Sequence, residues 1–529
     1  MGDCRVQGPD TPPVKSAEEM VGQFQAELIT ALPGWKERLR NHPEELGELE
    51  REVHVAFSRG ADLVIAGLVA VVMKTTAFEE ACERTRQGFA YPVERGQPRT
   101  RRVRLLGGLV LWITSLYCPA HRTRRTAADG KVPGVYVELA QFGCGKGCTP
   151  GLQSQVARQA ALCPSFELAQ QELEREGVCL DPKSVRRIAL QCGEGLLRLR
   201  RHELDLFRSG KLPAGRELAG KRVSVQLDGG RTRLRGDLRE ARPVAEATDA
   251  EGLPTENAPG RSRKRPRQTF DPDWREPKLL TIFVHDEQGR MVKQSQATID
   301  GTFLGPDAAG ELVAMHLHRL GAAAALTVTF VADGGTWIWN RIPAIVRLAQ
   351  LDGVSVHEVL DVCHATHHIG LALAALGWND KERLPLYREH RTLLRNGQWR
   401  RVVEELTELA EGKPADAKVW TEIEYLRKHG EAGRLKYPTF RSRGLPLGSG
   451  AIESSIRRVV NLRLKGNAIY WREENAEAML QIRALVLTRR WDERLMALHR
   501  LHLHDARSDW RWLPQELRSS LECDDTDTA

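Results

Sequence analysis

Features that define several special protein classes are scarce in this sequence. Ten cysteines in 529 residues are too few and too scattered for a disulfide scaffold, so we expect free thiols or a metal site in a reducing compartment. The longest apolar run, Leu63–Met73, is shorter than the ~18 residues that a membrane span requires. The first twenty residues lack the basic, apolar and small-residue order of a secretory signal. These absences predict a cytoplasmic protein.

The composition is that of a folded protein with a modest basic excess. Hydrophobic residues make up 41% and charged residues 28%, which is enough to build cores. A length of 529 residues predicts three or four domains. The net charge of +8 indicates a negatively charged partner.

The first 160 residues divide into a helical and a basic part. Apolar residues recur at helical spacing from residue 17 to about 90, which favours a packed bundle without chemistry. No acidic residue occurs between Arg95 and Asp129, whereas eight arginines surround the strand-like run LVLWITSLYC. Unopposed arginines favour contact with phosphates, and we expect Arg101, Arg102 and Arg104 to bind DNA.

Four residues of the basic part have the chemistry of zinc ligands. They form two pairs separated by a spacer rich in strand-forming residues, as in ribbon-type zinc sites: Cys118, His121, Cys144 and Cys148. The alternative is that the cysteines are free thiols on a glycine-rich turn.

A helix-turn-helix is predicted after residue 160. Ser165 is placed to cap a first helix that Gly177 ends, and Asp181 with Pro182 begins a second. The second helix carries Arg186 and Arg187, which favours DNA contact, although a cationic helix is also ordinary solvated surface. Residues 241–278 are charged and rich in proline, which predicts a flexible insert.

Three acidic residues are expected to converge in the C-terminal half. Two apolar strands end in Asp228 and Asp333, with a strand pair and a helix between them, so the two strands can lie in parallel. A helix beginning near Gly450 carries Glu453 in its first turn. Taken singly, the aspartates are also turn residues, and the glutamate is also a capping residue. Together they predict a site for Mg²⁺ or Mn²⁺, because clustered carboxylates stay ionised only beside cations.

These motifs resemble a known family. LDGGR, ADGGTWIW and GSGAIESS resemble the acidic triad of RNase H-like transposases from bacterial insertion sequences, most closely the Kra-type, Mutator-related branch. LDVCHATHH, with Asp361 and His364, is similar to the Asp-x-x-His element of that branch, and RLKGNAIYW to its basic–Gly–Trp motif. The resemblance spans about residues 220–495. Relatives often carry a tighter CxxC pair before the arginine-rich strand, which this chain lacks.

The resemblance implies a function and a set of roles. Two-metal chemistry would cleave DNA at the ends of a mobile element, and the freed 3′-hydroxyl would then attack target DNA. Asp228 would bridge both metals, Asp333 and Glu453 would each hold one, and His364 would assist. The pairing of two DNA ends implies at least a dimer, and the host would be bacterial, with the protein associated with the nucleoid.

Several nearby residues allow two interpretations. His364 and His368 share a helix face and either approach the scissile phosphate or are structural. Trp337 and Trp339 either stack on an unpaired base or belong to the core. Arg457, Asn461 and Lys465 recur every four residues on the Glu453 face and either hold the DNA end or face solvent.

The predicted fold class is α+β multidomain, with an RNase H-like α/β catalytic domain that carries an all-helical insertion. Two other functions fit the same residues: an RNase H-like nuclease without strand transfer, and a non-enzymatic zinc and helix-turn-helix regulator. The predicted units are a helical region (1–92), a basic and zinc-binding segment (93–160), a helix-turn-helix (161–215), the first part of the catalytic core (216–350), the helical insertion (351–447), the last catalytic helices (448–500) and a tail (501–529).

Overall fold

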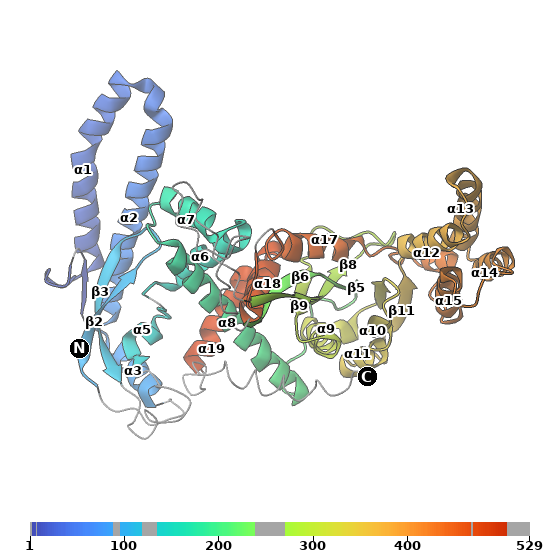
Figure 1. Ribbon diagram of the computed structural model, residues 1–529. Helices are drawn as coiled ribbons and strands as arrows, with labels where there is room; N and C mark the ends of the chain where they lie inside the picture. Colours follow the sequence, from blue (N-terminus) through green and yellow to red (C-terminus); the bar gives the residue numbers. More distant parts are fainter. Residues whose placement is uncertain are drawn as a thin grey trace, which may run out of the picture.

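The computed structural model describes residues 3–6, 8–87, 96–118, 135–145, 147–238, 270–466 and 469–504. The fold is mixed α and β, as predicted. The molecule is elongated: a helical hairpin projects at one end, a five-stranded sheet lies in the middle, and a helical arm forms the other end (Figure 1).

The N-terminal helices pack onto the basic strands. The projecting hairpin consists of α1 (Ala17–Asn41) and α2 (Leu46–Val72), joined by the short η1 (Pro43–Glu45) and followed by α3 (Thr76–Gln87). The strand β1 (Cys4–Val6) pairs with β3 (Val110–Cys118), which also pairs with β2 (Pro98–Arg104) and β4 (Val135–Tyr136). The boundary expected near residue 92 therefore falls inside one packed unit, because Leu63 of α2 and Leu111 of β3 share a core.

One helix among the described residues, counted with the preceding turn as Pro43–Val72, is long and apolar enough to cross a membrane. Its buried residues Leu63, Ala66 and Ala70 pack in the core that contains β1 and β3. A single helix of this kind is weak support for a membrane span, since core helices meet the same criteria.

Three helices follow the short α5 (Val137–Gln141), and the sequence predicts where the second begins and ends and where the third begins. They are α6 (Pro150–Leu162), α7 (Phe166–Arg175) and α8 (Pro182–Arg208). The side chains of Ser165 and Asp181 cap α7 and α8 by accepting hydrogen bonds from the backbone N–H of Leu168 and Ser184. Gly177, just after α7, has φ +85°, a conformation that favours glycine and ends the helix.

The central sheet has the order β9-β8-β5-β10-β11. Its central strand β5 runs parallel to β10, which runs parallel to β11, whereas β5–β8 and β8–β9 are antiparallel. The parallel arrangement of the two aspartate-bearing strands is therefore confirmed. The strands are β5 (Arg222–Gly229), β8 (Lys278–Val284), β9 (Thr298–Thr302), β10 (Thr327–Ala332) and β11 (Ser355–Leu360).

Three sequence expectations differ from the structure here. β11 belongs to the sheet, so the helical insertion begins after Leu360 rather than at residue 351. Residues Phe270–Arg275 form strand β7, which pairs with β6 (Thr232–Leu238), although they were expected in the flexible insert. The rest of that insert, residues 239–269, lies outside the described residues. The TWIW segment, whose alternating pattern is typical of a strand, is the short helix α10 (Thr336–Trp339).

The remaining helices surround the sheet or form the arm. Next to the sheet lie α9 (Pro306–Leu320), the single turn η2 (Ala322–Ala324) and α11 (Ile342–Leu348). The arm consists of α12 (Val362–Ala375), α13 (Asp380–Arg395), α14 (Trp399–Leu409), α15 (Lys418–Glu431) and α16 (Tyr437–Ser442). The chain then returns through α17 (Gly450–Ile456), the π-helical η3 (Arg457–Asn461), α18 (Glu473–Leu487) and α19 (Trp491–His504).

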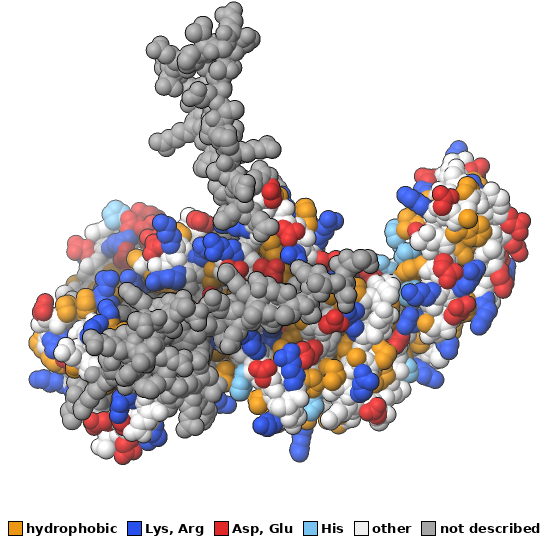
Figure 2. Space-filling view, turned by 60° about the horizontal axis from the view of Figure 1, so that its bottom comes forward, with side chains coloured by type: hydrophobic (Ala, Val, Ile, Leu, Met, Phe, Trp, Pro, Cys, Tyr) orange, Lys and Arg blue, Asp and Glu red, His pale blue; other side chains and the backbone are white. Residues whose placement is uncertain are grey.

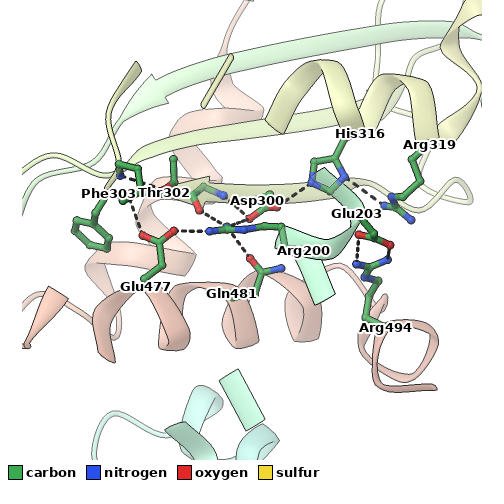
Figure 3. Close-up of polar contacts among 12 residues, drawn as sticks. Arg200, Glu203, Asp300, Thr302, Phe303, His316, Arg319, Glu477, Gln481 and Arg494 are labelled. Atoms are coloured by element: carbon green, nitrogen blue, oxygen red, sulfur yellow. Dashed lines mark hydrogen bonds and ion pairs between the residues drawn. The ribbon is translucent and has the colours of Figure 1, made fainter. Parts of the chain in front are cut away.

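A buried polar network joins α8 to the sheet and to α18 (Figure 3). The guanidinium of Arg200 on α8 lies 2.9 Å from the Asp300 carboxylate of β9 and 2.5 Å from the Glu477 carboxylate of α18. Asp300 also contacts His316 Nε2 of α9 at 2.8 Å. Because every one of these charges has a partner, the network fixes four elements against one another without leaving a buried ion unpaired.

Candidate functional site

Three aspartates stand at the same level where three parallel strands end. Val331 of β10 pairs with Gln226 of β5, so continuing the register by two residues places Asp333 beside Asp228. Ala332 pairs with Leu360 of β11, which places Asp333 beside Asp361 in the same way. Carboxyl ends of parallel strands share one sheet edge, and the three acids therefore occupy that edge.

Gln226 and Ser455 fasten the Glu453 helix to this edge. Gln226 lies two residues before Asp228, and its side-chain amide donates to the carbonyl of Gly448 at 3.0 Å and accepts from the N–H of Ile452 at 3.0 Å. The hydroxyls of Thr281 on β8 and Ser455 on α17 are 3.0 Å apart. The first turn of α17 is thereby held over β5, with Glu453 exposed.

Asp361 organises the same corner from inside. It is 2% exposed and caps α12, accepting hydrogen bonds from the backbone N–H of Cys363 (2.5 Å) and His364 (3.1 Å). Its other oxygen accepts hydrogen bonds from the backbone N–H and the hydroxyl of Ser449, the residue that precedes α17. One buried carboxylate thus sets the start of both the His364 helix and the Glu453 helix.

His364 and Glu453 meet at the surface of this corner. His364 Nε2 lies 3.4 Å from Glu453 Oε1, and the two side chains are 37% and 56% exposed. Figure 2 shows histidine side chains along the hollow between the main body and the helical arm. The functional interpretation of His364 is therefore compatible with its position beside an acid of the predicted triad.

The pKa of Asp228 is raised by its burial and by neighbouring acids. Burial raises its pKa, the negative charge of Asp333 raises it further, and that of Glu453 adds to the effect. The backbone N–H of Gly229 and the His364 ring act in the opposite direction, and the resulting pKa is about 6. Asp333, Glu453 and His364 are therefore all close enough to Asp228 to influence its ionisation.

The candidate site offers oxygen ligands of the kind that a hard divalent cation prefers, but they are not arranged around a common metal position. Three carboxylates offer oxygen ligands, and the raised pKa of Asp228 marks repulsion that a cation would relieve. However, among the residues that the structure describes, no group of three or more His, Cys, Asp and Glu side chains is arranged to hold a metal ion.

A cluster from the helical arm packs behind Asp333, and sequence reasoning missed it. The Tyr425 ring of α15 lies against Gly334, where an added Cβ would be only 1.9 Å from a ring carbon. The same ring stacks on His368 of α12 at 3.5 Å between centroids, and His368 Nδ1 hydrogen-bonds to the Glu422 carboxylate. These contacts favour the structural interpretation of His368.

The structure distinguishes the two tryptophans, and it shows that Arg457, Asn461 and Lys465 do not form one aligned row. Trp339 is buried and its indole N–H donates to the Asp333 carbonyl, so it belongs to the core. Trp337 is half-buried, with Lys278 Nζ 4.6 Å from its ring centroid. Arg457, Asn461 and Lys465 are exposed, but the π-helical η3 widens the helix and Lys465 lies beyond its end, so four-residue spacing does not align them.

The arginines predicted to bind DNA are exposed or half-exposed. Arg101 donates to the Tyr136 hydroxyl at 2.6 Å, and the Arg102 guanidinium lies 5.8 Å from the Trp112 ring centroid. Arg186 and Arg187 lie exposed near the start of α8. Burial raises the pKa of the Cys148 thiol, while the charges of Arg104 and Arg187 act against it, so β2 and the start of α8 bring positive charge to one place.

The four predicted zinc ligands are not brought together among the described residues. Cys144 and Cys148 lie close together on either side of one short turn. The charge of Cys148 accordingly raises the pKa of Cys144. Burial is the larger cause, and the resulting pKa values are about 12 for Cys144 and about 11 for Cys148. Cys118 is a free, buried thiol at the end of β3, and His121 lies outside the described residues.

Comparisons with protein-family models, with curated proteins and with solved structures found no match for this chain. The functional interpretation therefore depends on the geometry of the site and on the resemblance of its motifs.

Proposed function

We propose that this protein is a DNA transposase with an RNase H-like catalytic domain, in which Asp228, Asp333 and Glu453 form the acidic triad. The observation that carries the proposal is the register of β5 and β10, which sets Asp228 beside Asp333 at one sheet edge. The fastening of α17 to β5 by Gln226, with Glu453 in its first turn, supports it. The strand order β9-β8-β5-β10-β11 also supports it, because the two aspartate-bearing strands β5 and β10 are neighbours in the sheet.

The side chains divide the work of DNA cleavage among them. Asp228, Asp333 and Glu453 would hold Mg²⁺ or Mn²⁺, which when bound supplies an activated attacking oxygen and stabilises the leaving oxygen. His364 orients Glu453 through their 3.4 Å contact. Asp361 positions both residues by capping α12 and holding Ser449.

The basic N-terminal half would supply affinity for DNA ends. Arg101, Arg102 and Arg104 on β2 and Arg186 and Arg187 on α8 are placed to meet phosphates. Assembly as at least a dimer on two DNA ends and a cytoplasmic location near the nucleoid are also part of this proposal.

The test is cleavage of the DNA that flanks the coding sequence. Asp228→Asn should reduce Mg²⁺-dependent nicking by about a thousandfold, because one carboxylate of the catalytic group is lost. Asp352→Asn, at an exposed turn, is the matched control and should nick normally. Undiminished nicking by folded Asp228→Asn protein would refute the proposal.

Two further readouts separate the alternatives. Joined products between the flanking DNA and a target plasmid support transposition, whereas nicking without joined products favours a nuclease. DNA binding that is indifferent to Mg²⁺, with no cleavage at all, favours a regulator.

A further inference from the structure

The β6–β7 hairpin presents a face of alternating arginines and aromatic rings. Arg233 pairs with Trp274, Arg235 with Pro272, and Leu234 with Asp273. Because side chains alternate along a strand, Arg231, Arg233 and Arg235 lie on the face of Trp274. Leu234 and Thr232, on the opposite face, are buried. The arginine face is therefore the outer face of the hairpin.

The rings hold the guanidinium groups in place. Trp274 has Arg231 at 4.9 Å and Arg233 at 5.6 Å from its ring centroid, and Arg235 lies 5.1 Å from the ring of Phe270. Such contacts order the arginines. One N–H group each of Arg233 and Arg235 donates to a backbone carbonyl, and a guanidinium has further N–H groups that can donate to phosphate oxygens. Trp274 itself is 47% exposed, so part of its ring remains open to a stacking partner.

The hairpin is fixed beside the candidate site. Arg231 follows Asp228 by three residues, and Gly230 lies against Val460 of η3, the continuation of the Glu453 helix. The Thr232 hydroxyl donates to the Leu464 carbonyl at 3.1 Å, and Arg233 Nη2 donates to the Gly466 carbonyl at 2.8 Å. The β6–β7 pair is thus connected to β5, which carries Asp228, and held by the segment that follows the Glu453 helix.

Two acidic residues near this face, Asp273 and Glu276, pair with cations that do not belong to it. Asp273 lies opposite Leu234 on the other face and pairs with Arg275 at 2.7 Å. Glu276, just after the strand, pairs with Lys278 at 2.6 Å.

We propose that this face, Arg231, Arg233, Arg235 and Trp274, binds an unpaired DNA strand next to the cleavage position. The arginines would contact its phosphates and Trp274 would stack on a base. Exposed rings interleaved with arginines are typical of surfaces for single strands, because the base faces of a duplex are already covered. The inference rests on the proposed function for its location, but strand binding can be measured without cleavage.

The experiment compares two fluorescein-labelled duplexes of one arbitrary sequence, one fully paired and one with a short internal bubble. Binding of the full chain is followed by anisotropy in EDTA at several salt concentrations. Trp274→Ala should weaken binding to the bubble duplex about tenfold and to the paired duplex less than twofold. Trp274→Phe should retain most of the preference, because a phenyl ring still stacks. A combined Arg231→Gln and Arg235→Gln variant should lower the slope of log K against log salt on the bubble duplex by about 1.4.

Two matched variants act as controls. Phe57→Ala removes an exposed ring of α2, and Arg388→Gln removes an exposed charge of the arm; neither should change the preference for the bubble. Equal weakening of both duplexes by Trp274→Ala, or no weakening, would overturn the inference in protein that melts normally. Asp228→Asn should keep the preference, so a failure of cleavage and a failure of strand binding are told apart.

Discussion

Asp300 and Asp228 belong to the same sheet but have opposite surroundings. Burial alone would raise the pKa of Asp300, but Arg200 and His316 lower it by more and hold it below its ordinary value. Asp228 is raised by burial and again by Asp333, with a resulting pKa of about 6. A buried acid that is paired with a guanidinium from the chain is part of the scaffold. An acid whose nearest strong influence is another acid points to a cation from outside the chain.

The largest effect on stability is expected when Arg200, the buried cation that pairs with Asp300, is removed. Arg200→Leu should lower the free energy of unfolding by about 3–5 kcal/mol, because Asp300 and Glu477 are left buried without their partner. Urea unfolding followed by circular dichroism measures the change. Arg208→Leu, at the exposed end of the same helix, loses only solvent-accessible pairs with Glu311 and Asp205 and should cost under ~1 kcal/mol. Equal losses for the two variants would contradict the assignment of Arg200 to the scaffold.

A second test addresses how closely the arm supports Asp333. Gly334→Ala should cost about 1–3 kcal/mol, because the added methyl group would collide with the Tyr425 ring. The loss should appear in thermal melting together with weakened nicking. Gly353→Ala, where an added Cβ meets nothing within 4 Å, should change stability by under ~0.5 kcal/mol. If Gly334→Ala melts like wild type, the arm does not press on this strand end.

The sequence predicts the elements of the site better than its supports. β5 and β10 are β-branched apolar runs and Ser165 and Asp181 are strong caps, so their positions follow from local chemistry. β11 was missed because only its last two residues, Val359 and Leu360, are buried, so it lacks an apolar run. β7 contains Asp and Pro, which is typical of a turn, and its partner β6 lies more than thirty residues earlier in the chain.

The supports could not be predicted because they join distant residues. Tyr425 meets Gly334 across 91 positions, and Gln226 bonds to Ile452 across 226. Nothing in the helical pattern of α15 distinguishes Tyr425 from a core residue. Gln226 did carry a signal, since it is the one amide in the apolar run VSVQLD and sits two residues before Asp228.

A third prediction sharpens the contrast by removing the acid itself. In metal-free buffer above pH 6, Asp228→Asn should be more stable than wild type by ~1–2 kcal/mol, with solvent screening taken into account. The folded protein binds the Asp228 proton more tightly than the unfolded chain does. Wild type therefore gains stability as the pH falls from about 6 toward 4, and loses it as the pH rises through that window. Urea titrations across this range should show the slope in wild type and in Asp352→Asn, but a smaller slope in Asp228→Asn. A destabilised Asp228→Asn variant would place this acid with Asp300 in the scaffold.

The smallest effect on folding is expected at the contact between His364 and Glu453. Both side chains are partly exposed, so His364→Ala should change the free energy of unfolding by under ~1 kcal/mol. Nicking should nevertheless fall about tenfold, because Glu453 loses the group that orients it at the sheet edge. His367→Ala, three residues along the same helix and exposed, is the matched control and should leave both quantities unchanged. A large loss of stability in His364→Ala with normal nicking per folded molecule would assign this histidine to the scaffold. In that case Glu453 would belong to the candidate site and His364 to the scaffold, and the boundary between the two groups of residues would not follow the edge of the sheet.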